Sequence, residues 1–267
     1  MLKYSRNRNC DPIHKTYSDN INFWATDYRY LNDPYEIKYL YRCISQALAI
    51  YERAHHLPSK VGALEKIWGT WFSWEIRYIF SMSETIDNVS LWSRYADNGS
   101  GIAIAFDYQA LCKRMIRYGP QSGLKKVNYI KEESLMDRFD STLLHALYNE
   151  LDSSKSPYEY SLQTISPGHI SMNACYYKSC AYQDEQEWRI QTYRISPDKK
   201  DINFRERKGL IIPYLNLAIP IDCIKQIVVG PCANPLCIDA IGQMLTKYVS
   251  SYKIEILKSE LPYINHG

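Results

Sequence analysis

The sequence predicts a single α+β domain over residues 1–267, with helices inserted into a mixed or antiparallel sheet. Three observations lead to this fold class. β-prone segments alternate with amphipathic helical segments along most of the chain, and the part at about 187–258 is mainly β. No internal repeat, low-complexity tract or long linker divides the sequence. The glycine-rich turn Asp97–Gly101 precedes a predicted strand, whereas a dinucleotide fingerprint would follow one.

The clearest element is a helix that begins after Asn32-Asp33-Pro34 and ends near His55. Its apolar residues recur at three- and four-residue steps, as on one face of a helix. Asn32 or Asp33 is expected to cap this helix, and Glu36 in its first turn suits the helix dipole. The same polar pair has a second interpretation, in which both side chains lie at a pocket rim and present an amide and a carboxylate to a ligand.

The other elements follow from alternation in strands and from apolar stripes in helices. Strands are predicted at Leu2–Arg6, Ile21–Trp24, Arg77–Ser83, Ile102–Phe106, Lys125–Ile130, Glu187–Arg194, Ile202–Glu206, Ile211–Ala218, Ile224–Val229 and Lys253–Leu257. Further helices are predicted at Val61–Trp74, Ser90–Ala96, Tyr108–Arg117, Glu132–Leu151, Tyr158–Cys180 and Pro235–Val249. The helical segments at about 36–74 and 131–180 are interpreted as insertions into the sheet.

Composition narrows the function classes. The net charge of +3 is too small for a broad non-specific nucleic-acid surface, and no apolar run is long enough to span a bilayer. The chain opens on polar residues, so we expect a cytoplasmic protein whose eight cysteines are reduced. The pairs Cys175/Cys180 and Cys232/Cys237 are spaced more widely than ordinary zinc ligands, so no metal is expected. The 24 tyrosines suit either a pocket for a flat ligand or ordinary core and surface packing.

The sharpest chemical pattern is the alternation of Glu185, Glu187 and Arg189. On a strand these three share one face, and Trp188 and Ile190 occupy the other. Three interpretations stay open: a catalytic edge, a solvated ladder of charge pairs, or a buried structural ion pair. Arg189 stays charged, so it is expected to position a substrate or a carboxylate and not to carry a proton.

Four segments taken in order resemble the bacterial family called domain of unknown function 2971. They are Trp24 with Leu31-Asn32-Asp33-Pro34-Tyr35-Glu36; Phe80-Ser81-Met82-Ser83 with Leu91-Trp92-Ser93-Arg94-Tyr95-Ala96 and Gly101–Asp107; Tyr177-Lys178 with Tyr182 and Glu185–Ile190; and Ile224–Pro231. The segment between Tyr4 and Trp24 departs from the family pattern, which leaves the residues of the first strand uncertainly aligned.

A second resemblance, of segment order, is to ADP-ribosyltransferases, which have a split sheet and a late strand led by Glu-x-Glu. It implies that NAD is a substrate, that Glu187 stabilises the positive charge that develops as nicotinamide leaves, and that Glu185 assists. It also implies that Ser81 or Ser83 lies on the middle strand and that Tyr95 or Trp92 stacks on nicotinamide. Further ligand contacts are expected from the first strand and the family segments, at Lys3, Tyr4 or Arg6, and at Asn32, Asp33, Tyr182 and Arg189.

These resemblances make an NAD-consuming effector of toxin or phage-defence systems the first functional hypothesis. Its expected partners are a nucleotide ligand, a protein or nucleic-acid acceptor and a defence or antitoxin protein, with no membrane. The second hypothesis is a non-catalytic ligand-sensing or protein-interaction module with a tyrosine-rich groove. The third is a metal-dependent nuclease, with an ion held between Asp33 or Glu36 and the late glutamates Glu185 and Glu187.

Overall fold

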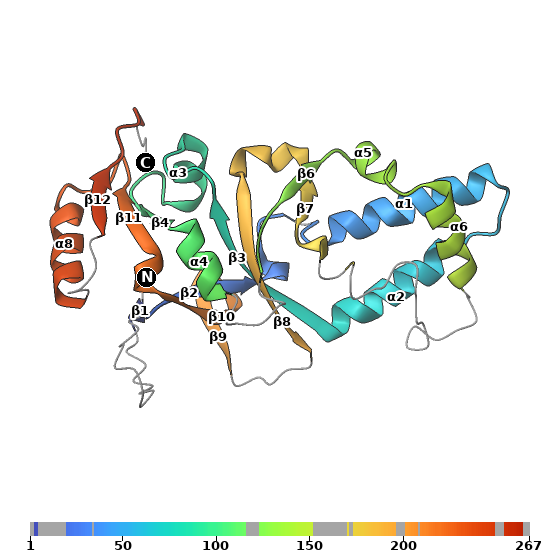
Figure 1. Cartoon of the computed structure of the whole chain (residues 1–267), viewed down its shortest axis with the longest axis horizontal. Helices are drawn as coiled ribbons and strands as arrows, with labels where there is room; N and C mark the ends of the chain where they lie inside the picture. Colours follow the sequence, from blue (N-terminus) through green and yellow to red (C-terminus); the bar gives the residue numbers. More distant parts are fainter. Residues whose placement is uncertain are drawn as a thin grey trace.

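The computed structural model describes residues 3–4, 20–33, 35–115, 123–151, 170, 173–195, 201–207, 209–248 and 254–263. Within these ranges the chain has the predicted α+β fold (Figure 1). Its largest sheet has seven strands in the order β5-β8-β3-β2-β10-β9, with β1 beside β2, and all of its pairings are antiparallel. The strands of this sheet are β1 (Lys3–Tyr4), β2 (Asn20–Asp27), β3 (Glu75–Ser83), β5 (Leu124–Lys126), β8 (Glu187–Ile195), β9 (Ile202–Arg207) and β10 (Leu210–Pro220).

Two smaller sheets flank the large one in the described part of the chain. β4 (Ile102–Phe106), β11 (Ile224–Val229) and β12 (Glu255–Lys258) form a three-stranded mixed sheet, against which α8 (Leu236–Tyr248) packs. β6 (Asn128–Ile130) and β7 (Tyr177–Ser179) form a parallel pair. β4 lines the cleft that is described below.

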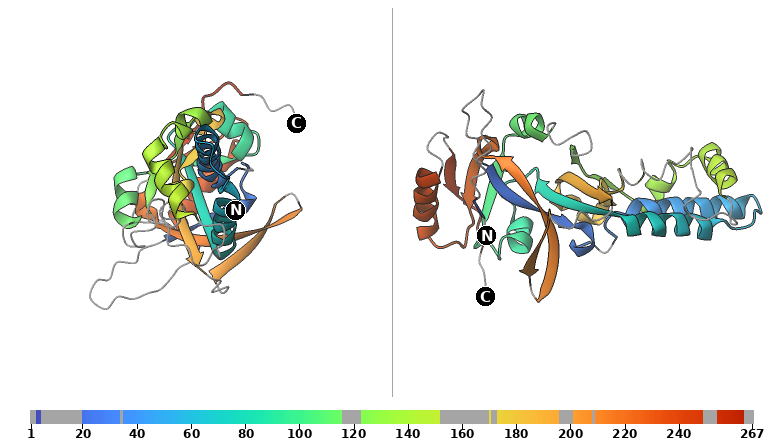
Figure 2. Two further views of the ribbon diagram at one scale, coloured as in Figure 1. Left: turned by 90° about the vertical axis from the view of Figure 1, so that its right-hand side faces the viewer. Right: turned by 90° about the horizontal axis from the view of Figure 1, so that it is seen from below.

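A helical arm extends from one end of the sheets, as the right side of Figure 1 and the right-hand view of Figure 2 show. It contains α1 (Lys38–Ala54) and α2 (Val61–Trp74), with α5 (Glu132–Met136) and α6 (Ser141–Glu150) packed on α1. Its core is the apolar face that the sequence periodicity predicted for α1, including Ile44 and Leu48 at 1% and 0% exposure. The arm therefore has a core of its own, joined to the sheet through Tyr28 and Ile79.

The large sheet is forked between β2 and β3. β2 pairs with β10 at seven positions and β3 pairs with β8 at nine, yet β2 and β3 pair with each other only at Thr26–Asp27 and Tyr78–Ile79. Phe23 and Phe80 contact each other beyond this junction at 5.2 Å between ring centroids, and Phe106 of β4 contacts both. The fork leaves an opening between the two halves of the sheet, with α3 (Val89–Tyr95) beside it.

Three predicted elements are wrong because a turn interrupts a continuous apolar pattern. The strand predicted at Lys125–Ile130 is two strands in different sheets. The amide of Val127 still donates to the backbone carbonyl of Glu187 in β8, whereas the amide of Asn128 donates to the carbonyl of Tyr176 next to β7. The helix predicted at Glu132–Leu151 is broken before Asp140, whose carboxylate accepts the amide of Leu143 and starts α6.

The end of the helix predicted at Tyr158–Cys180 is also wrong. Residues 177–179 form β7, and η4 (Cys180–Glu185) is a 3₁₀ helix that starts with Ser179 as its cap. Residues 158–169 and 171–172 of this predicted helix lie outside the described residues. Ile102–Phe106 is a strand as predicted; its apolar run suggests a buried strand, but four of its residues are half-buried and Ile102 is exposed.

The capping role predicted for Asn32 or Asp33 is wrong as well. The Asp33 carboxylate accepts the amide of Tyr35 at 2.8 Å, and its carbonyl accepts the amide of Glu36 at 3.0 Å, so Asp33 closes a turn ahead of the helix. α1 begins one turn later, after Ile37, whose φ of 66° is unusual for a β-branched residue. Because α1 begins at Lys38, Glu36 precedes the helix and does not lie in its first turn as predicted. Glu36 is buried at 5% exposure.

Candidate functional site

The candidate site is built where η4 turns into β8. Gln186 adopts a left-handed conformation with φ of 42°, which ends η4 and starts the strand. Glu187 and Arg189 share a strand face as predicted, whereas Glu185 lies in η4, ahead of the strand. All three side chains are nonetheless buried, at 6%, 6% and 1% exposure for Glu185, Glu187 and Arg189. The interpretation as a solvated ladder is therefore wrong.

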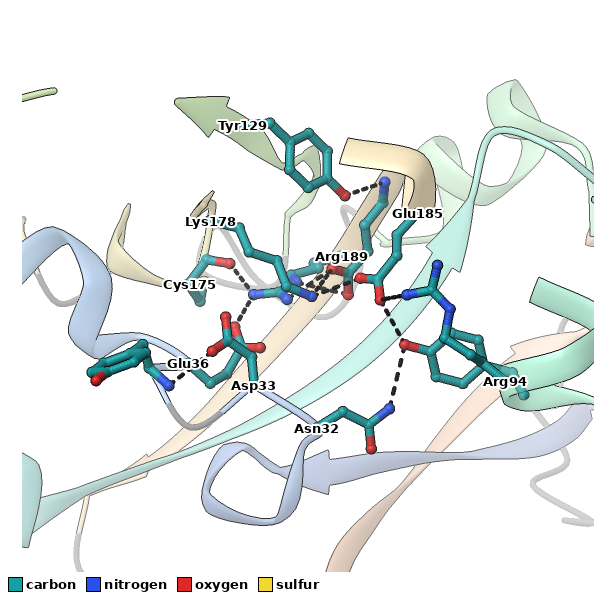
Figure 3. A network of polar contacts seen from close by, with 12 residues as sticks. Asn32, Asp33, Glu36, Arg94, Tyr129, Cys175, Lys178, Glu185 and Arg189 are labelled. Atoms are coloured by element: carbon teal, nitrogen blue, oxygen red, sulfur yellow. Dashed lines mark hydrogen bonds and ion pairs between the residues drawn. The ribbon is translucent and has the colours of Figure 1, made fainter. Parts of the chain in front are cut away.

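Arg189 is the centre of the buried network, which Figure 3 shows. Its Nε and Nη2 atoms donate to the two oxygens of Glu187 at 2.9 and 2.8 Å, and its Nη1 donates to Glu36 and to the carbonyl of Cys175. Such a two-point contact fixes the orientation of both planar groups. The guanidinium thus joins β8 to the turn before α1.

Lys178 of β7 is the second buried cation. Its Nζ donates to Glu185 at 2.7 Å and to Glu187 at 3.4 Å, and it lies 4.6 Å from the ring centroid of Tyr182. Burial alone would lower the pKa of Lys178, but the charges of Glu187 and Glu36 outweigh it and the pKa is raised. The Tyr182 ring therefore covers the lysine, and this residue is not among those that line the cleft described below.

Glu185 connects this buried network to the surface. One of its oxygens accepts the Tyr95 hydroxyl at 2.8 Å and an Arg94 nitrogen at 3.3 Å, and Asn32 donates to the same hydroxyl at 3.3 Å. Tyr95 is 49% exposed, so its side chain is where the network reaches the surface of the protein. Burial of the hydroxyl and its hydrogen bond to Glu185 raise the pKa of Tyr95.

The two carboxylates on Arg189 have opposite pKa shifts. Burial raises the pKa of Glu36, and the attraction of Arg189 does not fully offset it. For Glu187 burial also acts upward, but Arg189, Lys178 and the Ser81 hydroxyl together lower the pKa. Glu187 is thus the more firmly ionised of the two, with donors on both of its oxygens.

A cleft of about 880 Å³ opens over this network and along the fork of the sheet. This volume lies in the range of about 300–1,000 Å³ that is usual for small-molecule sites. Its lining includes the predicted site residues Asn32, Ser81, Trp92, Tyr95, Glu185, Glu187 and Arg189. The structure therefore brings into one cleft residues from four separate segments of the chain.

Two other predicted contacts are not among the residues that line this cleft. Asp33 is buried in its turn at 5% exposure, and Tyr182 covers Lys178. The backbone of Tyr4 in β1 pairs with Ile21 of β2, but the side chain of Tyr4 lies outside the described structure. The side chains of Lys3 and Arg6 also lie outside it.

Trp92 does not form a ring clamp with Tyr95. It is only 2% exposed, and its indole nitrogen donates to Asp87 at 2.6 Å. Asp87 also accepts the hydroxyl of Ser259 at 2.8 Å, so Trp92 helps to hold the chain after β12 against α3. The stacking role predicted for Trp92 is replaced by a packing role, which leaves Tyr95 as the accessible aromatic residue of the pair.

Sequence reasoning missed Lys178 and the buried position of Glu36. Lys178 lies in a segment that was predicted to be helical. The presence of Tyr177-Lys178 among the segments of the family resemblance was the one signal that could have identified it as a site residue. Glu36 lay in a helix-start motif, and no local pattern indicates that a residue 153 positions away neutralises it.

The arrangement of cations bears on the metal hypothesis. The guanidinium of Arg189 lies between Glu36 and Glu187, where that hypothesis places an ion. Its fixed positive charge would repel a divalent cation at this position. Within the described residues no group of three or more His, Cys, Asp or Glu side chains is arranged to hold a metal.

Comparison with known proteins identifies a family over part of this site. Residues 91–190 match the model of the family described as protein of unknown function (DUF2971). The predicted resemblance is confirmed. The matched range contains Tyr95, Glu185, Glu187 and Arg189, whereas Asn32, Ser81 and β9 lie outside it. No curated protein and no solved structure matches the chain.

None of the helices in the described part of the protein is long and apolar enough to cross a membrane.

Proposed function

We propose that the cleft binds an NAD-like dinucleotide and that the protein breaks the bond between nicotinamide and ribose, as ADP-ribosyltransferases and NAD glycohydrolases do. The observation that supports this most is the hydrogen bond of 2.8 Å between the hydroxyl of the half-exposed Tyr95 and the buried carboxylate of Glu185, in the cleft that also contains Ser81 and Glu187. The hypothesis requires these residues to meet in one concave site. A Glu187 on a convex surface, far from the others, would have contradicted it.

The two glutamates take different roles in this proposal. Glu187 accepts from two nitrogens of Arg189 and from Lys178 and Ser81, so few of its lone pairs face the cleft. Glu185 accepts from Lys178 through one oxygen and from Tyr95 and Arg94 through the other, at the edge of the cleft. We therefore assign the group that faces the substrate to Glu185 and a positioning role to Glu187.

The proposed step is heterolytic. The bond between C1′ of the ribose and the nicotinamide nitrogen breaks, and its electron pair leaves with nicotinamide. A nearby carboxylate stabilises the positive charge that develops on the ribose. Water or the hydroxyl, amine or base of an acceptor then forms the new bond to C1′ and loses its proton. Tyr95 and Asn32, which share one hydrogen bond, would orient the ribose or the nicotinamide amide at the cleft edge.

The two alternative hypotheses fit the geometry less well. A ligand-sensing module was expected to have a pocket without convergent charged groups, whereas Lys178, Glu185, Glu187 and Arg189 converge here. A metal nuclease would need an ion at the position that Arg189 occupies. A role in toxin or phage defence, the acceptor and a defence or antitoxin partner stay predictions.

The test is NAD turnover by the purified protein, with and without a cell extract as the source of acceptor. Nicotinamide release should fall by about 10²- to 10³-fold in Glu185→Gln, since a charge-stabilising contact to the reacting centre is lost. Glu65→Gln, an exposed glutamate on α2 outside the cleft lining, is the matched control and should retain full activity. NAD binding without nicotinamide release would support the sensing module, and release that Glu185→Gln leaves unchanged would contradict the assigned role.

A further inference from the structure

The face of the sheet that carries Glu187 continues to the far edge strand, β9. Residues directly opposite each other on antiparallel strands share a face. The pairs Ile79–Gln191, Thr26–Ile79, Tyr214–Thr26 and Tyr214–Asn203 therefore connect one face across five strands. Because side chains alternate along a strand, Glu187 and Arg189 of β8 lie on this face, as do Arg205 and Arg207 of β9. All four side chains line the same cleft.

Arg205 is held in place by neutral groups. Its guanidinium carbon lies 4.6 Å from the centroid of Trp24 and 5.9 Å from that of Tyr214, and its Nη2 donates to the Thr26 hydroxyl at 2.9 Å. Its Nε is buried and has no hydrogen-bond partner in the described structure. A buried donor without an acceptor is costly, so an acceptor at this edge of the guanidinium would stabilise the site.

Arg207 adds a second positive charge beside it. Burial and the proximity of Arg207 lower the pKa of Arg205. Among the described residues no carboxylate forms an ion pair with either guanidinium, in contrast to Arg189, which is neutralised by two. Glu206 points to the other face and accepts the amide of Gly209 at 2.6 Å in the β9–β10 turn. This end of the cleft is therefore positive and lacks a described counter-ion.

We propose that Arg205 and Arg207, with Thr26, form a subsite for the phosphate groups of the ligand in the cleft. Arginine suits this role because its planar fork donates two hydrogen bonds to one phosphate. β9 is four strands from β8, but the Arg205 guanidinium reaches back to Thr26 of β2, which is two strand spacings from β8, or about 10 Å at the usual spacing of about 4.8 Å. A ligand that contacts both Glu185 and Arg205 therefore extends along the cleft, with its phosphates beyond the group that meets Glu185. The inference rests on the proposed function for the glutamate end only, because the arginine end has its own evidence.

Binding of ADP, inorganic pyrophosphate and adenosine, measured by calorimetry, tests the subsite. The wild type should bind ADP at least about tenfold more tightly than adenosine, as expected for charge-assisted hydrogen bonds to phosphate. Arg207→Gln and Arg205→Met should abolish this preference and leave adenosine binding unchanged. Arg138→Gln removes the same charge from an exposed position outside the cleft lining and should change neither affinity.

The outcomes separate the subsite from the proposed reaction. If Arg207→Gln and a folded Arg205→Met both retain the preference for ADP, the subsite is wrong, and Arg205 only stacks on Trp24. In that case nicotinamide release by the wild type would still support the proposed function. If the arginine variants lose ADP binding while the wild type releases no nicotinamide, the subsite stands and the reaction does not. Failure of the wild type to bind ADP or pyrophosphate would overturn the subsite outright.

Discussion

Glu36 and Arg189, which are 153 residues apart in the chain, form an ion pair that is almost completely shielded from water. The pair joins the turn before the helical arm to the strand that carries the candidate site. Because the same guanidinium also holds Glu187, one side chain fixes two carboxylates from distant segments. The arm and the floor of the cleft are thereby coupled through a single cation.

Replacement of Arg189 by methionine should destabilise the protein strongly. It leaves Glu36 and Glu187 buried without their main partner, and breaking a buried ion pair in this way costs about 3–5 kcal/mol. The free energy of unfolding from urea titration is the measurement. Arg94→Gln is the matched control, because Arg94 is 41% exposed and its bond to Glu185 should contribute at most about 1 kcal/mol. Equal losses in the two variants would show that the buried network is not a stabilising element.

Acid should act on Glu187 and Glu36 in opposite directions. The pKa of Glu187 is lowered from 4.5, so its contribution to stability is complete above about pH 4.5 and is lost as the pH falls through the lowered value. Burial raises the pKa of Glu36, so its contribution is present below about pH 4.5 and is lost as the pH rises through the raised value. Glu187→Gln should therefore flatten the acid limb of the stability profile, measured by urea unfolding from about pH 3 to 6. Glu36→Gln should instead remove the loss above about pH 4.5, and identical profiles for both variants would contradict the opposite shifts.

Tyr95→Phe should separate ligand binding from folding. It removes the hydroxyl that donates to Glu185, and a hydrogen bond to a charged group is worth about 1.5–3 kcal/mol, or roughly 10- to 100-fold in NAD turnover. The free energy of unfolding should fall by less than this, because Glu185 keeps Lys178 and Arg94 as donors. Tyr35→Phe, at 50% exposure and outside the cleft lining, is the control for loss of a tyrosine hydroxyl. Turnover that is equal in both variants would remove Tyr95 from the site.

Trp92→Phe should show the reverse behaviour. Loss of the indole nitrogen leaves the Asp87 carboxylate with one fewer donor, and the smaller ring leaves space in a buried position. We expect the free energy of unfolding to fall by about 1–3 kcal/mol while the affinity for NAD changes little. Parallel measurements of unfolding and of NAD affinity distinguish this packing role from stacking. A selective loss of affinity in a fully stable variant would restore the stacking role.

Much of the fold follows from local pattern. The periodicity of α1, the alternation in β8 and β10, and the turn residues between them predicted nearly every described strand and helix within a few positions. The errors at Val127, Asp140 and β7 have one cause. In each case the pattern of side chains continues along the chain, but backbone hydrogen bonds or a side-chain cap end the element. The periodicity of apolar residues gives no sign of such hydrogen bonds or caps.

The sequence by itself determined the α+β class, the shared strand face of Glu187 and Arg189, and several polar residues of the cleft, including Asn32, Ser81 and Glu185. Only the tertiary structure decided that this face is covered, that Glu36 and Lys178 complete the network, and that Trp92 is packed while Tyr95 is accessible. The physical reason is that alternation specifies which side chains share a face, whereas burial depends on what packs against that face. That covering comes from a helical arm and a turn more than a hundred residues away, whose contact with β8 leaves no local trace in the chain.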